Sequence, residues 1–418
     1  MSICFNGVPD PLPANSAMKW MALPLLACLC SSIMTNAPAS AQPQAPTAGA
    51  MVDFGDPHLK QLAARLKSQQ RPRLVLAQLG DSHTAADFFT GQLRRRLQAD
   101  YGDGGIGWLP PMATPGILHD QAVMGTEGWT LLAATAGARD VDYPLGGLIA
   151  RTGNPWSGSM VTPVNEADRK DGWRMSLWLR GAPDFKPLAW RDTREVITPI
   201  PAVANDGRWH QVAFPVTLPA ILMVQDAPSY DIGGIVLERT QGAALAGGAQ
   251  VDAFGSNGVK LSATGAWGAG WMAMLGERKP DIVALAYGTN EAFDTALDAT
   301  RYEAQLKDTI AGLRKAVPDA VLLLIGPPAL ASAVGPQDSR CTTPVPAGLQ
   351  AVRDIQRRVA QQMHTLFWDW QAAMGGPCGM KDWQSRGWGG ADGIHFTVDG
   401  YRHAADLLRD DLKALGGI

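Results

Sequence analysis

The spacing of apolar residues changes its period twice along this chain, and that change limits the folds open to it. Towards both ends, short continuous apolar runs alternate with stretches whose apolar residues recur at helical spacing. Such alternation is typical of a parallel sheet covered by helices on both faces. The predicted strands are Arg73–Gly80, Gln250–Phe254, Ile282–Tyr287, Ala320–Ile325 and Thr365–Trp370, and the predicted helices are Ala85–Tyr101, Tyr302–Val317, Leu349–Met363 and Asp399–Leu415.

Between roughly 113 and 248 the period falls to two. Apolar Trp173, Met175 and Leu177 alternate with Arg174 and Ser176, and turn-forming clusters separate such runs. This pattern indicates antiparallel strands and a β-sandwich. A chain of 418 residues has room for two or three domains. We therefore predict an α/β domain in two parts, 55–112 and 249–418, with a β-sandwich over 113–248 inserted between them.

The N-terminus has the pattern of an export signal. Lys19 precedes an apolar run, Trp20–Leu29, and the small residues Ala39 and Ala41 suit cleavage before Gln42. The run is shorter than the roughly 20 residues that span a bilayer, so no stable membrane span is expected. We predict a signal peptide over 1–41, with Met18 as an alternative start, a linker over 42–54 and a periplasmic location.

The five cysteines divide between the signal and the exported part. Cys28 lies in a weak lipobox, which leaves a lipid anchor there as the less favoured alternative. Beyond the signal only Cys341 and Cys378 remain, and an even pair in an oxidising compartment favours a disulfide over two unrelated thiols. Neither has a Cys or His at zinc-ligand spacing, so no metal is expected there. The net charge of −3 offers no basic excess for nucleic-acid binding.

The first chemical motif is Gly80-Asp81-Ser82-His83, between a predicted strand and a predicted helix. Open α/β sheets place their sites at the carboxyl ends of strands, where a serine hydroxyl is exposed. The N-terminus of the following helix favours a developing negative charge. Taken alone, the tetrapeptide fits an ordinary helix cap better than a catalytic motif, because Asp and Ser are good caps.

Two further motifs follow later strands. Asn290 comes directly after Ile282–Tyr287, where its amide can donate to an oxyanion, although Gly288 and Thr289 also suit a plain turn. Asp392 and His395 precede the last helix. Three residues apart in a compact loop, they can hydrogen-bond, so that the carboxylate sets the imidazole tautomer and stabilises its cation.

In this order, Ser, Asn and Asp-x-x-His resemble the SGNH (GDSL-type) hydrolase family over about 55–110 and 250–418. The resemblance implies a flavodoxin-like three-layer α/β/α sandwich and ester hydrolysis without metal or cofactor. It implies that Ser82 is the nucleophile, His395 its base and Asp392 the orienting carboxylate. The oxyanion donors would be Asn290 and the backbone N–H groups of Ser82 and Gly258, with Gly255 in reserve.

A narrower likeness concerns the sequence around the first motif. Gly80–Ala85, Asp87–Phe89 and Gly102–Gly107 resemble the peptidoglycan O-acetylesterase branch of that family. Members of that branch carry an inserted carbohydrate-binding-like sandwich and act on the acetyl group of N-acetylmuramic acid, so the resemblance implies an acetylated glycan as partner. Trp178, on the polar face of its predicted strand, is the best candidate for glycan contact, although core packing is the more common role of tryptophan.

Other functions stay open at this point. Asp81, His83, Asn290, Asp392 and His395 are all metal-ligand types, but the second ligand motif of a dinuclear phosphoesterase is missing from the sequence. The same serine chemistry could serve another acetylated polymer such as cellulose, or transfer acetyl groups between glycans. A non-catalytic glycan-binding protein is the alternative from a different class. The oligomeric state is not predicted.

Overall fold

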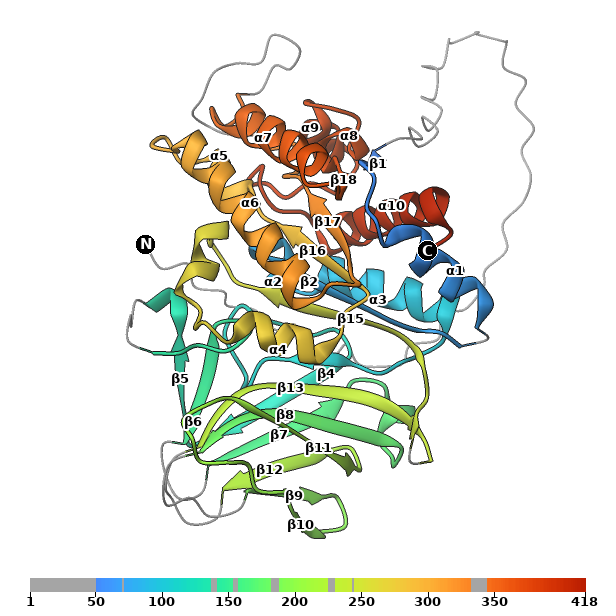
Figure 1. Ribbon diagram of the computed structural model, residues 1–418, viewed down its shortest axis with the longest axis vertical. Helices are drawn as coiled ribbons and strands as arrows, with labels where there is room; N and C mark the ends of the chain where they lie inside the picture. The colour runs from blue at the N-terminus through green and yellow to red at the C-terminus, as the bar shows by residue number, and fades with distance from the viewer. Residues whose placement is uncertain are drawn as a thin grey trace, which may run out of the picture. The chain divides into compact units, whose positions relative to one another are not determined.

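A computed structural model describes residues 50–418, except 70, 137–140, 153–156, 182–187, 225–229, 243 and 332–343. Its first sheet has six strands in the order β1-β18-β17-β16-β2-β15 (Figure 1). All neighbours in this sheet are parallel except β1, which runs antiparallel to β18. The strands are β1 (Met51–Asp53), β2 (Arg73–Gly80), β15 (Gly248–Gly255), β16 (Ile282–Ala286), β17 (Val321–Ile325) and β18 (Leu366–Trp368). Without the edge strand β1 the order is that of a flavodoxin-like sheet.

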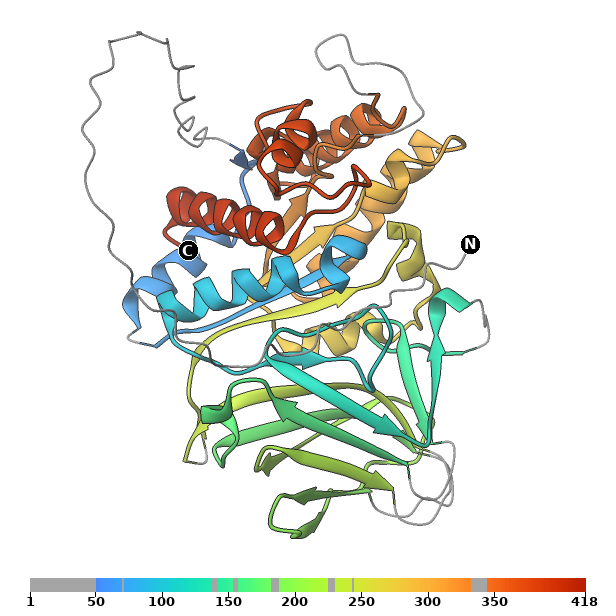
Figure 2. The same cartoon turned by 180° about the vertical axis from the view of Figure 1, so that it is seen from behind.

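Helices cover both faces of this sheet because successive strand residues point to opposite sides. Leu74 and Leu76 of β2 pack with one group of helices, whereas Ala77 and Leu79 pack with the other. The first group is α1 (Leu59–Ser68), α3 (Phe88–Tyr101) and α10 (Val398–Gly416), and the second is α4 (Trp271–Arg278), α6 (Ala299–Ala316) and α7 (Leu349–Gln362). Figure 2 shows α10 and α3 side by side on their face. The predicted three-layer α/β/α architecture is confirmed.

The middle of the chain forms two antiparallel sheets that face each other. The smaller sheet has the order β10-β9-β12-β7-β4, and the larger has β11-β8-β13-β6-β5 with β3 and β14 added to β13. Apolar residues from both sheets, such as Val161 and Leu177, fill the space between them. The strands are β3 (Gly107–Leu109), β4 (Ala122–Glu127), β5 (Trp129–Ala133), β6 (Leu148–Thr152), β7 (Gly158–Pro163), β8 (Trp173–Gly181), β9 (Leu188–Asp192), β10 (Ile197–Pro199), β11 (His210–Val216), β12 (Ala220–Val224), β13 (Tyr230–Gln241) and β14 (Ala244–Leu245). The predicted inserted sandwich is therefore present.

Trp178 is not exposed to solvent, as a glycan contact would require. It lies on the predicted face of its strand, but that face of the larger sheet packs against the α/β domain. Its side chain is 1 % exposed, shares a core with Leu79 and Phe254, and donates from Nε1 to Glu277 Oε2 at 3.2 Å. The predicted glycan contact at Trp178 is wrong, because alternation marks the two faces of a strand without saying what covers them.

Two segments near the N-terminus differ from expectation. Met51–Asp53, inside the predicted linker 42–54, forms edge strand β1, and helix α1 was not predicted at all. The predicted signal peptide over 1–41 and Cys28 lie outside the described residues. In the part of the chain that is described, no helix combines the length and hydropathy needed to cross a membrane.

The predicted domain boundaries and the predicted disulfide are only partly covered by the described residues. Strand β3 pairs with β13 of the sandwich although it precedes residue 113, and the predicted domain boundaries stay a prediction. Cys378 is disulfide-bonded. Cys341 lies outside the described residues, so its pairing with Cys378 also stays a prediction.

Candidate active site

Three neighbouring strands end together at one edge of the parallel sheet. Gly80, the last residue of β2, is in register with Gly255 of β15 on one side and with Ala286 of β16 on the other. A side chain at residue 80 would place its Cβ 2.8 Å from the Ala286 carbonyl oxygen, so only glycine fits this crowded position. The segments that follow these three strands are therefore close together, and they carry Ser82, Gly258 and Asn290.

Ser82 is the first residue of the short helix α2 (Ser82–Ala85). Asp81 caps this helix by accepting the backbone N–H of His83 on Oδ1 at 3.0 Å. Backbone N–H groups in the first turn of a helix have no partner inside the helix, so the N–H of Ser82 points into the space before α2. Strand, cap and helix thus present the Ser82 hydroxyl and its own N–H at the same edge of the sheet.

The loop before α10 brings an imidazole to this hydroxyl. Ser82 Oγ lies 2.9 Å from His395 Nε2, and His395 Nδ1 lies 2.7 Å from Asp392 Oδ2. We assign the Nδ1 proton to the Asp392 hydrogen bond, which leaves Nε2 free to accept from Ser82. The structure therefore joins three residues that are up to 313 positions apart in a serine, histidine and carboxylate chain.

The carboxylate of Asp392 also shapes its own loop. Its Oδ1 accepts the backbone N–H groups of Ile394 and His395, each at 2.9 Å, and Gly393, directly after Asp392, has a φ of +69°. Burial alone would raise the pKa of Asp392, but the hydrogen bonds from the His395 ring and from these backbone groups outweigh it and lower that pKa. Asp392 is thus held as a carboxylate, although its side chain is 47 % exposed and that of His395 44 %.

Gly258 and Asn290 follow β15 and β16, the two strands on either side of β2. Asn290 is in α5 (Thr289–Ala292), and its Nδ2 donates to the carbonyl oxygen of Val259, the neighbour of Gly258, at 2.8 Å. An amide nitrogen has two hydrogens, so one remains for a ligand. Gly258 is exposed, with a φ of +72°, whereas Gly255 is buried and packs closely against Thr84 and Ala85. The geometry therefore favours Gly258 over Gly255 as the accessible backbone donor.

The carboxyl group of the cap residue Asp81 has an unusually high pKa. Burial raises its pKa to about 7, against the lowering effect of the His83 backbone hydrogen bond, and the nearby Glu291 carboxylate raises it further. The folded protein therefore holds a proton at Asp81 from about pH 4 to pH 7, a range in which the unfolded chain has released it. A group of this kind stabilises the fold at low pH, and its contribution is lost as the pH rises to 7.

Exchanging Asp81 for asparagine should flatten this pH dependence. Asn keeps an acceptor oxygen for the His83 N–H but has no proton to lose. Each unit of pKa shift corresponds to about 1.4 kcal/mol, so the wild-type protein should lose up to about 4 kcal/mol of unfolding free energy between pH 4 and pH 8 that D81N does not lose. Urea unfolding at several pH values measures this. D399N, at an exposed carboxylate, should follow the wild type, and parallel curves for D81N and wild type would contradict the assignment.

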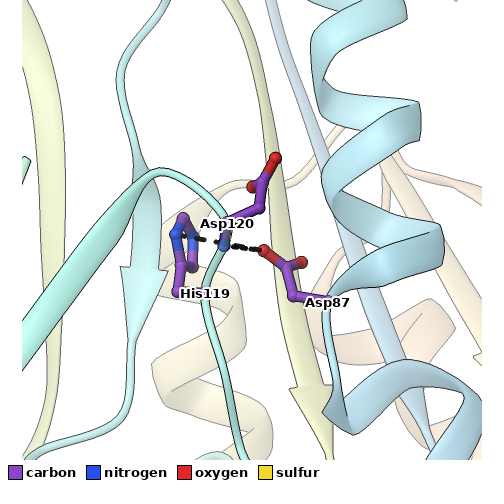
Figure 3. A group of neighbouring side chains, drawn as sticks. All are labelled: Asp87, His119 and Asp120. Atoms are coloured by element: carbon purple, nitrogen blue, oxygen red, sulfur yellow. Dashed lines mark hydrogen bonds and ion pairs between the residues drawn. The ribbon is translucent and has the colours of Figure 1, made fainter. Parts of the chain in front are cut away.

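A second group of titratable side chains lies beside α3. Asp87, His119 and Asp120 bring their ligand atoms within 4.8 Å of one another (Figure 3). The guanidinium of Arg94 already binds both carboxylates, at 2.8 Å from Asp87 Oδ2 and 2.6 Å from Asp120 Oδ1. Burial, reinforced by Arg94, lowers the pKa of His119 to about 3. With its carboxylates neutralised by an arginine, the group is suited to an internal ion-pair cluster and not to a metal.

Two residues of the site were not picked out by sequence reasoning. His83 was considered only as a possible metal ligand, yet it is 3 % exposed and its ring lies beside that of His395. Tyr401, which has no motif of its own, hydrogen-bonds to His83 from the first turns of α10. The only sequence signal for them was their position, directly after the serine and six residues after the histidine.

Comparison with known proteins agrees with this geometry. Residues 236–403 match the GDSL-like lipase/acylhydrolase family, and residues 104–221 match the N-terminal domain of peptidoglycan O-acetylesterase. Neither range contains Ser82. Among curated protein sequences, none matches the chain.

Solved structures are also similar. One titled "Peptidoglycan O-acetylesterase in action" is 35 % identical over 88 % of this chain and 99 % of its own, with a TM-score of 0.76. A protein described as a GDSL-like lipase from Parabacteroides merdae is 17 % identical over 39 % of this chain and 73 % of its own, with a TM-score of 0.32. A family two carbohydrate esterase from Cellvibrio japonicus is 11 % identical over 71 % and 99 %, with a TM-score of 0.28.

The first of these structures is decisive, because its identity to this chain extends over nearly its whole length and includes both the α/β domain and the sandwich. The chain belongs to the SGNH (GDSL-type) hydrolase family and carries the N-terminal domain that is characteristic of peptidoglycan O-acetylesterases.

Proposed function

We propose that this protein is a serine esterase that removes O-acetyl groups from peptidoglycan, at the acetylated hydroxyl of its N-acetylmuramic acid. The observation that carries the proposal is the 35 % identity to a peptidoglycan O-acetylesterase over 99 % of that chain. The hydrogen-bonded order Ser82, His395 and Asp392 supplies the parts that the reaction requires.

The first half of the reaction transfers the acetyl group to the enzyme. His395 Nε2 takes the proton of Ser82 Oγ while Oγ attacks the acetyl carbonyl carbon. The negative charge on the carbonyl oxygen is met by the free N–H of the Asn290 amide and by the backbone N–H groups of Gly258 and Ser82. A donor of this kind is typically worth about 3–4 kcal/mol in the transition state. His395 then gives its proton to the departing sugar oxygen, and the acetyl group stays on Ser82.

The second half restores the enzyme. A water molecule, deprotonated by His395, attacks the acetyl carbonyl carbon, and the proton returns to Ser82 Oγ as acetate leaves. Asp392 holds the imidazole in the required tautomer and stabilises its cation in both halves. Every step is a proton transfer or an acyl transfer, so these side chains are sufficient for the chemistry.

The substrate also bears on the location. Peptidoglycan lies outside the cytoplasmic membrane, so we infer that the protein works in the periplasm, in agreement with the export pattern of residues 1–41. An acetylated glycan is the partner that this function requires.

The substrate is tested by acetate release. The purified protein should release acetate from O-acetylated peptidoglycan and none from the same material after mild alkaline de-O-acetylation. Acetylated xylan and cellulose acetate should be cleaved with kcat/KM values at least tenfold lower, and S82A should release nothing from any of them. Equal or faster turnover of acetylated xylan or cellulose would contradict the proposed substrate while leaving the esterase chemistry intact.

A further inference from the structure

The residue directly after the nucleophile is buried next to the catalytic base. The His83 ring centroid lies 5.4 Å from that of His395, 5.4 Å from Trp370, 5.6 Å from Phe396 and 5.8 Å from Tyr401. The proposed reaction of Ser82 and His395 does not involve this imidazole. A polar ring in such an aromatic setting costs free energy unless its hydrogen-bonding atoms are used.

One ring nitrogen of His83 is used, and its partner leads back to the catalytic loop. Nδ1 lies 2.9 Å from the hydroxyl oxygen of Tyr401, which is 318 positions away on α10. The same oxygen accepts the backbone N–H of Phe396. We assign the phenol proton to the bond with His83 Nδ1, which places the His83 proton on Nε2, an atom with no hydrogen-bond partner among the described residues.

These contacts form a closed ring of connections. Ser82 is bonded to His83, which accepts from Tyr401, which accepts from Phe396, which is bonded to His395, which hydrogen-bonds to Ser82. The nucleophile and its base are therefore connected twice, once directly and once behind the site. The direct bond breaks during each turnover, whereas the second connection takes no part in the proton transfers and stays formed.

We propose that His83 and Tyr401 are positioning residues that hold Ser82 and His395 at reacting distance through this second connection. The proposal rests on the proposed function, since it assigns Ser82 and His395 their roles as nucleophile and base. His83 is suited to this role because it stays neutral. Burial, with a smaller effect of His395, lowers its pKa to about 3. It therefore places no positive charge beside the imidazolium that forms on His395.

Tyr401→Phe is the sharpest test, because it removes one oxygen and keeps the ring. A 1 Å misplacement of reacting groups can cost about 100-fold in rate, so we expect Y401F to lower kcat about tenfold with KM unchanged. In an H395A background, Y401F should change the residual rate less than twofold, because there is no base left to position. p-Nitrophenyl acetate serves for all variants.

A matched control removes the same oxygen elsewhere. The phenol of Tyr230, in β13 of the sandwich, is also buried and hydrogen-bonded to a backbone group, that of Leu188. Y230F should lower the melting temperature about as much as Y401F and leave kcat unchanged. Position 83 gives a second test that does not depend on Y401F folding. H83N offers an acceptor oxygen close to the place of Nδ1 and should retain more of kcat than H83L, which offers none.

The outcomes separate this proposal from the proposed function. A kcat for Y401F within twofold of wild type, an equal loss in the H395A background, or equal losses in H83N and H83L would each overturn the positioning role. If S82A itself keeps its activity, the proposed function fails first.

Discussion

Replacing Ser82 with alanine is expected to lower kcat for acetyl-ester hydrolysis about 10⁵- to 10⁶-fold without changing the fold. The size follows from covalent catalysis: with no Oγ, no acetyl-enzyme forms, and only binding and oxyanion stabilisation remain. The side chain is partly exposed and its hydroxyl hydrogen-bonds to His395, so its loss should leave the melting temperature nearly unchanged. Steady-state rates on p-nitrophenyl acetate and on O-acetylated peptidoglycan measure the effect.

The control for this variant is another serine in a helix. Ser385 of α9 (Gly379–Ser385) donates to the carbonyl oxygen of Asp382, so S385A should keep the wild-type rate. A serine-directed sulfonyl fluoride should label residue 82 in the wild-type protein and in S385A, as read by peptide mass. More than about 1 % of wild-type activity in S82A would show that Ser82 is not the nucleophile.

Asp392→Asn should have the second largest effect, a fall in kcat of about 100- to 1,000-fold. Asn can still accept the backbone N–H groups on its Oδ1, but its amide then presents hydrogens to His395 Nδ1. The imidazole must turn its proton away from Asp392, which places it on the nitrogen that should accept from Ser82. The effect is smaller than in a fully buried triad, because both side chains are nearly half exposed and solvent screens their interaction.

The matched control for Asp392 is Asp399, an exposed carboxylate in the first turn of α10 that pairs with Arg402. D399N makes the same chemical change seven residues away and should leave kcat unchanged. If D392N loses less than threefold while S82A is inactive, His395 does not depend on this carboxylate and another group must orient it.

How much of this molecule follows from the sequence depends on whether the signal is local. The strands β2 and β15–β18 and the helices α3, α6, α7 and α10 were predicted, because each carries its own apolar period, whereas α4 was not predicted. Ser82, Asn290, Asp392 and His395 were also selected from the sequence, since each stands after a predicted strand or before a predicted helix, and their roles stay a prediction. The fold brings Ser82 and Asn290 to the same edge of the sheet because they follow parallel strands, and the loop before α10 brings Asp392 and His395 to Ser82.

The failures concern what one segment does to another. The alternation in β8 correctly predicted which face of the strand carries Trp178. That α4 covers this face depends on how the two domains pack, which no local pattern indicates. The hydrogen bond between His83 and Tyr401 joins residues 318 positions apart, and Tyr401 belongs to no motif. Edge strand β1 has only three residues and is defined by its pairing with β18, so no local sequence pattern predicts it.

The packing of Trp108, Trp178 and Val236 of the larger β-sheet into the same core as Leu79 and Phe254 has an evolutionary consequence. The sandwich cannot be exchanged for that of a relative as a free-standing module, since a foreign one would leave the underside of the α/β layer open or collide with it. A substitution on one side of this shared core therefore persists only where the residues on the other side accommodate it.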